Sequence, residues 1–217
     1  MENKVTELVF ILDKSGSMWG MEEDTIGGFN AMIEKQKQQE GKVLVSTVLF
    51  SNTQEVLHDR KNLDEIAPLT ENDYKVGGST ALLDAIGLAI RHIGNIHKYA
   101  RKEDVPNKTM FIITTDGLEN ASRRYLSDKV KSMIKNQEEK YGWEFVFLAS
   151  NIDAVETARF IGIREERAIN YAVNSETRAM YEELGESIRR YRACGYMPED
   201  YAEDFEKRLG EKRKKSK

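Results

Sequence analysis

Residues 5–17 read Val-Thr-Glu-Leu-Val-Phe-Ile-Leu-Asp-Lys-Ser-Gly-Ser, a β-rich, mostly apolar run that stops at an aspartate. Such a run is typical of a strand that is buried on both faces of a parallel sheet. Two serines follow Asp13 at intervals of two, with Gly16 between them. The stretch therefore predicts a central strand that carries a carboxylate and two hydroxyls at its carboxyl end.

The rest of the chain alternates between strand and helix patterns. Strands are predicted at 43–50, 54–58, 109–115, 143–148 and 168–173, and helices at 26–40, 82–93, 126–134, 153–160 and 175–193. Only three residues separate the second strand from the third. A connection this short can join only antiparallel strands, so these two strands form a hairpin. We therefore predict an α/β, doubly wound, Rossmann-like sheet of six mostly parallel strands in the order 3-2-1-4-5-6. Strand 3 is its antiparallel edge, and helices cover both faces.

Composition indicates one folded domain of a soluble protein. The 217 residues are 40% hydrophobic and 32% charged, with a single cysteine, Cys194, and no apolar run of the roughly 18 residues that span a membrane. We assign 1–195 to the domain and 196–217 to a C-terminal helical extension, expected to be exposed, with a basic tail. Without a secretion signal or a disulfide framework, we expect a cytoplasmic location.

Charge limits the class of partner. The net charge of the chain is −4, but residues 210–217 are basic, so the remainder of the chain has a more negative net charge. An acidic body repels phosphates, so we expect no nucleic-acid partner, and we expect no membrane partner either.

Three polar motifs stand at the predicted strand ends or open a helix. Asp13-Lys-Ser-Gly-Ser17 follows strand 1, Thr115-Asp116-Gly117 follows strand 4, and Gly77-Gly-Ser-Thr80 precedes the helix at 82–93. In the predicted strand order the topology reverses between strands 1 and 4, and ligands of doubly wound sheets bind at that point. The side chains offer only hard oxygen atoms, which favour Mg²⁺, Mn²⁺ or Ca²⁺ over zinc or copper.

These motifs resemble the metal-ion-dependent adhesion site of von Willebrand factor A (vWA) domains, and they are also similar to small bacterial intracellular members of that family. The resemblance covers residues 5–173. It implies that Mg²⁺ or Mn²⁺ is held by five side chains, some of them through water, and that the sixth position takes an acidic side chain of a partner. The implied ligands are Asp13, Ser15, Ser17, Thr80 and Asp116.

The leading hypothesis is a metal-dependent protein-binding module that is not an enzyme and whose partner presents Asp or Glu. Met18 and Trp19 are the candidates for an apolar rim that contacts this partner. One alternative is a Mg²⁺-dependent phosphohydrolase of the haloacid-dehalogenase kind, although that chemistry needs a second aspartate where this chain has Ser15. Another is a scaffold domain with a vacant site.

Some residues near the start of the helix at 82–93 also have interpretations that involve no metal. Thr80, or Ser79 beside it, is a plausible N-cap for the helix at 82–93. Asp84 lies in the first turn of that helix, where a favourable interaction with the helix dipole explains it without any metal ligation.

Overall fold

The sheet has the predicted strand order. The computed structural model describes residues 5–172 and 176–215. In these residues the strands are β1 (Val5–Asp13), β2 (Lys42–Phe50), β3 (Gln54–Asn62), β4 (Lys108–Thr115), β5 (Glu144–Ala149) and β6 (Ala168–Asn170). The order is β3-β2-β1-β4-β5-β6, with β3 antiparallel to β2 and the other pairs parallel. The predicted doubly wound α/β fold, with an antiparallel edge at strand 3, is confirmed.

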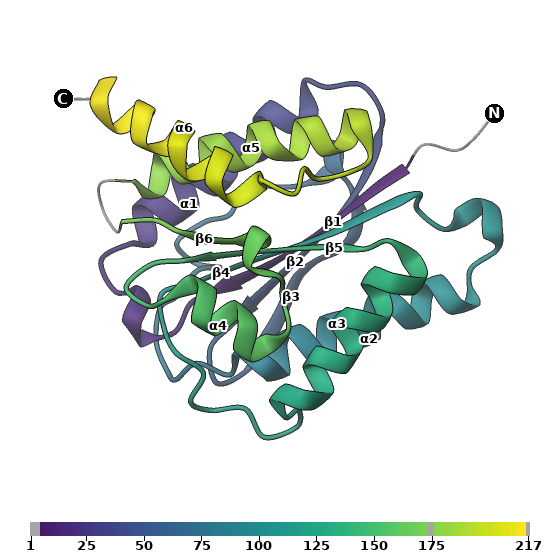
Figure 1. The fold of residues 1–217 in the computed structure, drawn as a ribbon, viewed down its shortest axis with the longest axis horizontal. Coiled ribbons are helices and arrows are strands. Elements are labelled where there is room, and N and C mark those ends of the chain that lie inside the picture. Colours follow the sequence, from purple (N-terminus) through teal and green to yellow (C-terminus); the bar gives the residue numbers. More distant parts are fainter. Residues whose placement is uncertain (1–4, 173–175, 216–217) are drawn as a thin grey trace.

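Helices cover both faces of the sheet (Figure 1). They are α1 (Glu22–Lys37), α2 (Leu82–Tyr99), α3 (Ser127–Tyr141), α4 (Ala154–Ile161), α5 (Thr177–Cys194) and α6 (Tyr201–Lys215). Alternate residues of β1 point to opposite faces, so Phe10 and Leu12 join the core under α1, α5 and α6, whereas Val9 and Ile11 join the core under α2, α3 and α4. Every residue of β1 is buried, as expected for a central strand. None of the helices in the described residues is long and apolar enough to cross a membrane.

Several element ends differ from the sequence prediction. Helix α1 begins at Glu22, four residues early, because acidic residues in its first turn complement the helix dipole without continuing the apolar pattern. Strand β6 ends at Asn170 rather than at 173, and residue 173 itself lies outside the described residues. The predicted start of the next helix at 175 also lies outside them, and α5 begins at Thr177.

The C-terminal helix is packed on the domain, not exposed as predicted. Three apolar residues at intervals of four, Tyr201, Phe205 and Leu209, are buried in the core that α1 and α5 share. Upstream of the helix, the buried Arg167 guanidinium donates hydrogen bonds to the carbonyls of Met197 and Pro198. The charged residues between the apolar positions hid this stripe in the sequence. The end of the predicted basic tail, 216–217, lies outside the described residues.

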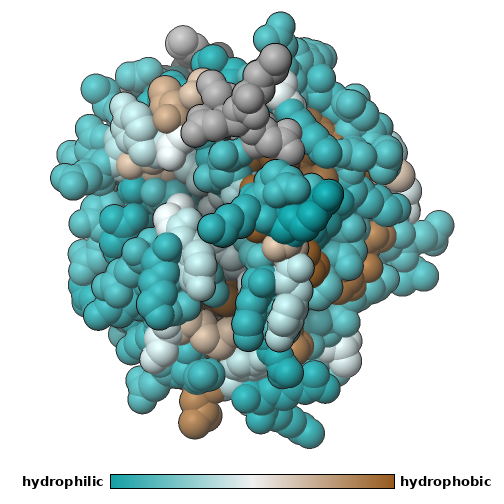
Figure 2. All heavy atoms as spheres, turned by 90° about the vertical axis from the view of Figure 1, so that its right-hand side faces the viewer, coloured by the Kyte–Doolittle hydropathy of each residue, from teal (hydrophilic) through white to brown (hydrophobic). Residues whose placement is uncertain are grey.

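The two ends of the strands present different surfaces. Figure 2 shows the face at the amino ends of the strands, where the described residues are mostly hydrophilic and the hydrophobic ones form separate small groups. At the carboxyl ends, by contrast, the loops after β1 and β4 expose the large side chains of Trp19 and Leu118. Exposed apolar side chains are therefore present at the end of the sheet that carries the predicted site.

We predict that Phe205→Ala lowers the free energy of unfolding by about 3–5 kcal/mol, because it leaves a cavity in the core under α6. Urea unfolding followed by circular dichroism measures this change. Lys207→Ala, at an exposed position of the same helix, is the matched control and should change stability by less than about 0.5 kcal/mol. Equal, small effects of both substitutions would show that α6 does not belong to the domain core.

Candidate metal centre

Strand register places Asp13 at the carboxyl edge of the sheet, beside the end of β4. Asp13 is the last residue of β1, and its neighbour in the sheet, β4, ends at Thr115. The Thr115 hydroxyl donates a hydrogen bond to Asp13 Oδ2, and the backbone N–H of Ser15 donates to Asp13 Oδ1 at 2.7 Å. The Tyr74 hydroxyl donates to the Asp13 carbonyl from the other side. The Asp13 carboxylate is therefore oriented by Thr115 and by the Ser15 N–H, and Tyr74 fixes the backbone of the same residue.

The other four predicted residues form a continuous chain of hydrogen bonds. The Thr80 hydroxyl donates to Ser15 Oγ at 3.0 Å, and Ser15 Oγ lies 3.1 Å from Ser17 Oγ. The Ser17 hydroxyl donates to Asp116 Oδ1 at 2.6 Å. With Ser15 also bonded to Asp13 through its backbone, all five predicted side chains lie in one cluster, although they come from three loops that are far apart in the sequence.

The loop before α2 is fastened to the loop after β1 by backbone hydrogen bonds. The Gly16 N–H donates to the Gly78 carbonyl at 2.9 Å, and the Gly77 N–H donates to the Lys14 carbonyl at 2.9 Å. A Cβ on Gly16 would lie 3.2 Å from the Gly78 oxygen, and Gly78 has a φ of +82°. Glycine is needed at both positions, since Gly16 has little room for a side chain and Gly78 adopts a left-handed conformation.

Thr80 does not cap α2, contrary to the sequence prediction, and neither does Ser79. The side chains that cap this helix come from the loop after β4: Glu119 accepts from the Leu83 N–H at 2.8 Å, and Ser122 accepts from the Asp84 N–H at 3.0 Å. The Thr80 hydroxyl is consequently free to face Ser15. The capping residues were missed because they lie almost forty residues further along the chain.

Asp84 is a structural residue of the same loop. Its buried carboxylate accepts hydrogen bonds from the backbone N–H groups of Arg123, Arg124 and Tyr125, at 3.0, 2.9 and 2.9 Å. These three bonds fasten the segment 117–126 to the first turn of α2. The expectation that Asp84 is not a metal ligand agrees with this arrangement, although the interaction is with a loop and not only with the helix dipole.

Burial raises the pKa of both carboxyl groups of the cluster. Burial raises the pKa of Asp13 to about 6, against the opposing effect of its hydrogen bonds from Thr115 and Ser15. Burial likewise raises the pKa of Asp116, opposed by the Ser17 hydroxyl. No described residue forms a salt bridge with either group, because the nearby Lys14 is paired with Glu55 at 2.6 Å. The site therefore lacks a protein cation to balance two buried carboxylates.

The donor set fits a hard divalent cation. The cluster offers two carboxylates and three hydroxyls, the ligand types that Mg²⁺ and Mn²⁺ prefer. Asp116 Oδ2 is buried and has no hydrogen-bond partner among the described residues, which is costly unless a ligand satisfies it. Within the described residues no three His, Cys, Asp or Glu side chains converge, so a site built from those residue types alone is not present.

Of the two residues predicted for the apolar rim, one is exposed and the other is buried. Trp19 is 80% exposed, but Met18 is only 1% exposed, because the short 3₁₀ helix Gly16–Met18 turns its side chain into the core under α1. Leu118, two residues after Asp116, is 61% exposed and was missed. Its position two residues after the aspartate that follows β4 was the signal in the sequence that could have identified it.

The architecture matches solved vWA structures. The vWF domain of the type V pili tip protein Mfa5 from Porphyromonas gingivalis aligns with a TM-score of 0.65 and 10% identity, over 90% of this chain and 99% of that one. The chain has the von Willebrand factor A fold. A von Willebrand factor type A protein from Catenulispora acidiphila aligns with a TM-score of 0.57 and 13% identity, over 85% of this chain and 42% of that one.

The likeness to vWA proteins is structural, not one of close sequence. The ArnB paralog VWA2 from Sulfolobus acidocaldarius aligns with a TM-score of 0.54 and 16% identity, over 86% of this chain and 45% of that one. The chain thus spans less than half the length of two of these solved chains. No protein-family model matches it, and no curated protein does. The resemblance expected from the sequence is confirmed at the level of the fold.

We predict that the metal-free protein loses stability as the pH rises from about 4 to about 7. Folded Asp13, with its pKa near 6, binds a proton more tightly than it does in the unfolded chain, so protonation favours the folded state and this benefit disappears above pH 6. A rise of about two pKa units corresponds to roughly 3 kcal/mol. Urea unfolding in EDTA at a series of pH values measures the loss, and Asp13→Asn should show a shallower decline. Parallel curves for the two proteins would contradict the burial of a protonatable Asp13.

Proposed function

We propose that this chain is a metal-dependent protein-binding module that holds Mg²⁺ or Mn²⁺ and binds an acidic side chain of a partner protein. The observation that carries the proposal is the convergence of five oxygen-bearing side chains around two buried carboxylates that have no protein counter-charge. The residues that would hold the ion are Asp13, Ser15, Ser17, Thr80 and Asp116.

Charge balance supports the choice of a carboxylate on the partner. Asp13 and Asp116 neutralise a dication, whereas the three hydroxyls donate oxygen without adding charge. When bound, the ion supplies a positively charged coordination position that a partner's Asp or Glu can occupy. Magnesium takes about six oxygen ligands, so five side chains leave room for one more.

The exposed rim supports a protein rather than a small molecule as the ligand. Trp19 and Leu118 follow the metal-binding loops directly and expose 80% and 61% of their surface. Tryptophan is one of the residue types that contribute most to protein–protein binding, and Leu118 adds apolar contact area beside it. We propose that these two side chains contact the partner on either side of its acidic residue.

The alternatives remain distinguishable by experiment. In the haloacid-dehalogenase hypothesis a carboxylate two residues after Asp13 acts as the general acid, but Ser15 occupies that position and its hydroxyl is hydrogen-bonded to Thr80 and Ser17. Hydrolysis of p-nitrophenyl phosphate that is lost in Asp13→Asn would favour it. In the vacant-scaffold hypothesis the protein does not respond to metal. A cytoplasmic location stays a prediction.

We predict that Mg²⁺ or Mn²⁺ stabilises the protein. At about ten times the dissociation constant the free energy of unfolding should rise by roughly 1.4 kcal/mol, because the ion binds only the folded state. Thermal melts in EDTA and in added metal measure this increment. Asp13→Asn and Asp116→Asn should abolish it, since each removes a charge that holds the dication.

Asp128→Asn is the matched control for these variants. Asp128 lies in the first turn of α3 and is exposed, so its substitution removes one carboxylate outside the cluster. This variant should keep the full response to metal. An increment that survives in Asp13→Asn, or one absent from the unmodified protein, would reject the metal centre.

We predict that the rim and the metal contribute separately to partner binding. A phage-displayed peptide library selected on the protein in Mg²⁺ should yield peptides whose binding is lost in EDTA and when their contacting Glu is changed to Gln. Trp19→Ala and Leu118→Ala should each weaken these peptides about tenfold or more while the melting response to Mg²⁺ is unchanged. Undiminished peptide binding in EDTA would contradict the acidic-anchor mechanism and leave the metal centre intact.

A further inference from the structure

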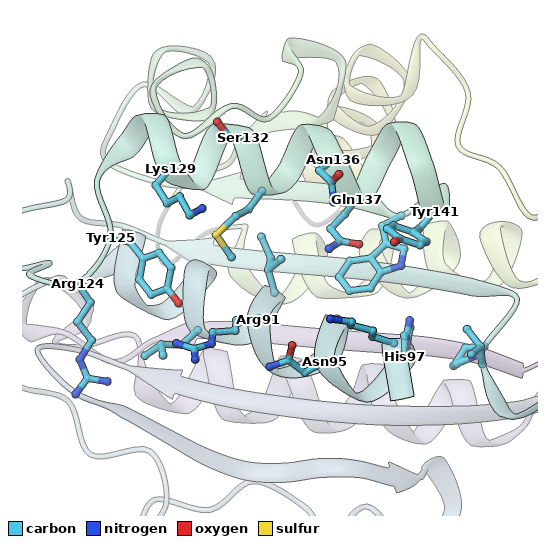
Figure 3. Close-up of a pocket in the computed structure, with 18 residues that line it drawn as sticks. Arg91, Asn95, His97, Arg124, Tyr125, Lys129, Ser132, Asn136, Gln137 and Tyr141 are labelled. Carbon is cyan, nitrogen blue, oxygen red and sulfur yellow. The ribbon is translucent and has the colours of Figure 1, made fainter. Parts of the chain in front are cut away.

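A groove of about 1050 Å³ lies between α2 and α3 (Figure 3), and it shares no residue with the proposed metal centre. Small-molecule sites in proteins measure about 300–1,000 Å³, so the groove has room for a ligand of nucleotide size. Its walls come from α2, α3, the loop 117–126 and the residues around Pro106 and Trp143.

The groove is positively charged in an otherwise acidic chain. None of the described residues that line it is Asp or Glu, although the chain has 37 acidic and 33 basic residues. Three cations of the lining, Arg91, Arg124 and Lys129, form no side-chain hydrogen bond or ion pair with any other described residue. They lie toward the end of the groove that carries Tyr125, with Lys129 and Arg91 on different sides of its ring and the Arg124 guanidinium directed away from it (Figure 3). An anion at this end would compensate charges that the protein itself leaves unpaired.

The backbone at this cationic end is firmly positioned, although the three cationic side chains are exposed. The Asp84 carboxylate, which is 6% exposed, accepts hydrogen bonds from the backbone N–H groups of Arg124 and Tyr125 at 2.9 Å each. The Tyr125 ring packs directly on α2 at Gly87. The approach is so close that a Cβ on Gly87 would lie only 2.5 Å from the ring. The positions of the Arg124 backbone and of the Tyr125 ring are thus set before any ligand arrives, which lowers the entropic cost of binding.

The other end of the groove carries amides and aromatic rings and fewer cations without an anionic partner. Asn95 of α2 and Gln137 of α3 approach it from opposite sides, with Tyr141 beyond them (Figure 3). The two amides form no side-chain hydrogen bond with a described residue, so they can offer both donors and acceptors to a ligand. Gly94 keeps the floor open, because a Cβ there would already lie 3.4 Å from Gln137 Nε2 and 3.9 Å from Trp143.

The two basic residues at this second end are already engaged. His97 Nε2 is hydrogen-bonded to the fully buried Glu7 carboxylate at 2.5 Å, and Lys98 Nζ lies 5.2 Å from the centre of the Tyr99 ring. Positive charge without an anionic partner is therefore concentrated at one end, where three cations lie, against Lys98 alone at the other end. An acidic peptide would be matched by cations along its whole length, whereas a ligand with a charged head and an uncharged planar ring matches this division.

We propose that the α2–α3 groove binds a nucleotide-class ligand, with its phosphate at Arg91, Arg124 and Lys129 and its ring between Asn95 and Gln137. Guanidinium and ammonium groups are the side chains best suited to phosphate oxygens. The amides pair with donors and acceptors on the edge of the ring. The loop 117–126 carries Arg124 and also follows Asp116, so it connects this groove to the proposed metal centre.

The test is calorimetric titration of the full chain with AMP and GMP in EDTA, so that binding through the proposed metal centre does not contribute. At least one mononucleotide should bind at least about tenfold more tightly than inorganic phosphate or adenosine, since each of these probes fills only one end. Arg124→Gln/Lys129→Gln should weaken this binding about tenfold or more, because it removes two phosphate contacts. Lys135→Gln/Lys140→Gln is the control: it removes the same charge from α3 at positions that do not line the groove.

A second variant tests the ring end without a change of charge. Gly94→Leu projects a side chain across the floor between Gln137 and Trp143 and should abolish mononucleotide binding while inorganic phosphate binds as before. If its melting curve shows that it does not fold, the charge variants carry the test alone. The proposal is overturned if neither mononucleotide binds at about 5 mM, if the control pair loses binding equally, or if polyglutamate binds where both mononucleotides do not.

Discussion

The burial of two carboxylates at the carboxyl ends of β1 and β4 is the constraint on which the rest of the structure depends. Asp13 ends a strand that is buried along its whole length, so its charge cannot reach bulk water. Its orientation is set by Thr115 and by the Ser15 N–H, which forces the loop after β1 to turn back over the strand end. Ser17 then donates a hydrogen bond to Asp116, the first residue after the neighbouring strand β4. Charge that would destabilise an ordinary core is held where a dication can compensate it.

The loop after β4 links several parts of the molecule. It begins at Asp116, caps α2 through Glu119 and Ser122, and is fastened to Asp84 by three backbone N–H groups. By taking over the capping of α2, it releases the Thr80 hydroxyl to the cluster. Near its end, Arg124 and Tyr125 form one wall of the α2–α3 groove. A change in the position of this loop would therefore move residues of both proposed binding sites.

Most of the sheet was predictable, because the signals for it are local. Apolar runs that stop at Asp13 and Asp116, and a three-residue link between β2 and β3, are enough to predict the strand order and the antiparallel edge. The ends of α1 and β6 were less predictable, since helix dipole effects and short edge pairing leave little trace in hydrophobic periodicity. The packing of α6 was missed because three buried apolar residues are separated by charged ones.

The sequence by itself determined the α/β topology and the five oxygen-bearing side chains of the cluster, because apolar runs and the polar motifs that follow them can be recognised locally. Only the tertiary structure decided which side chains near the cluster face solvent. Met18 turns inward, Leu118 and Trp19 stay outside, and Glu119 rather than Thr80 or Ser79 caps α2. These outcomes depend on which surfaces remain uncovered after helices and loops from distant parts of the chain have packed, and no local pattern records that.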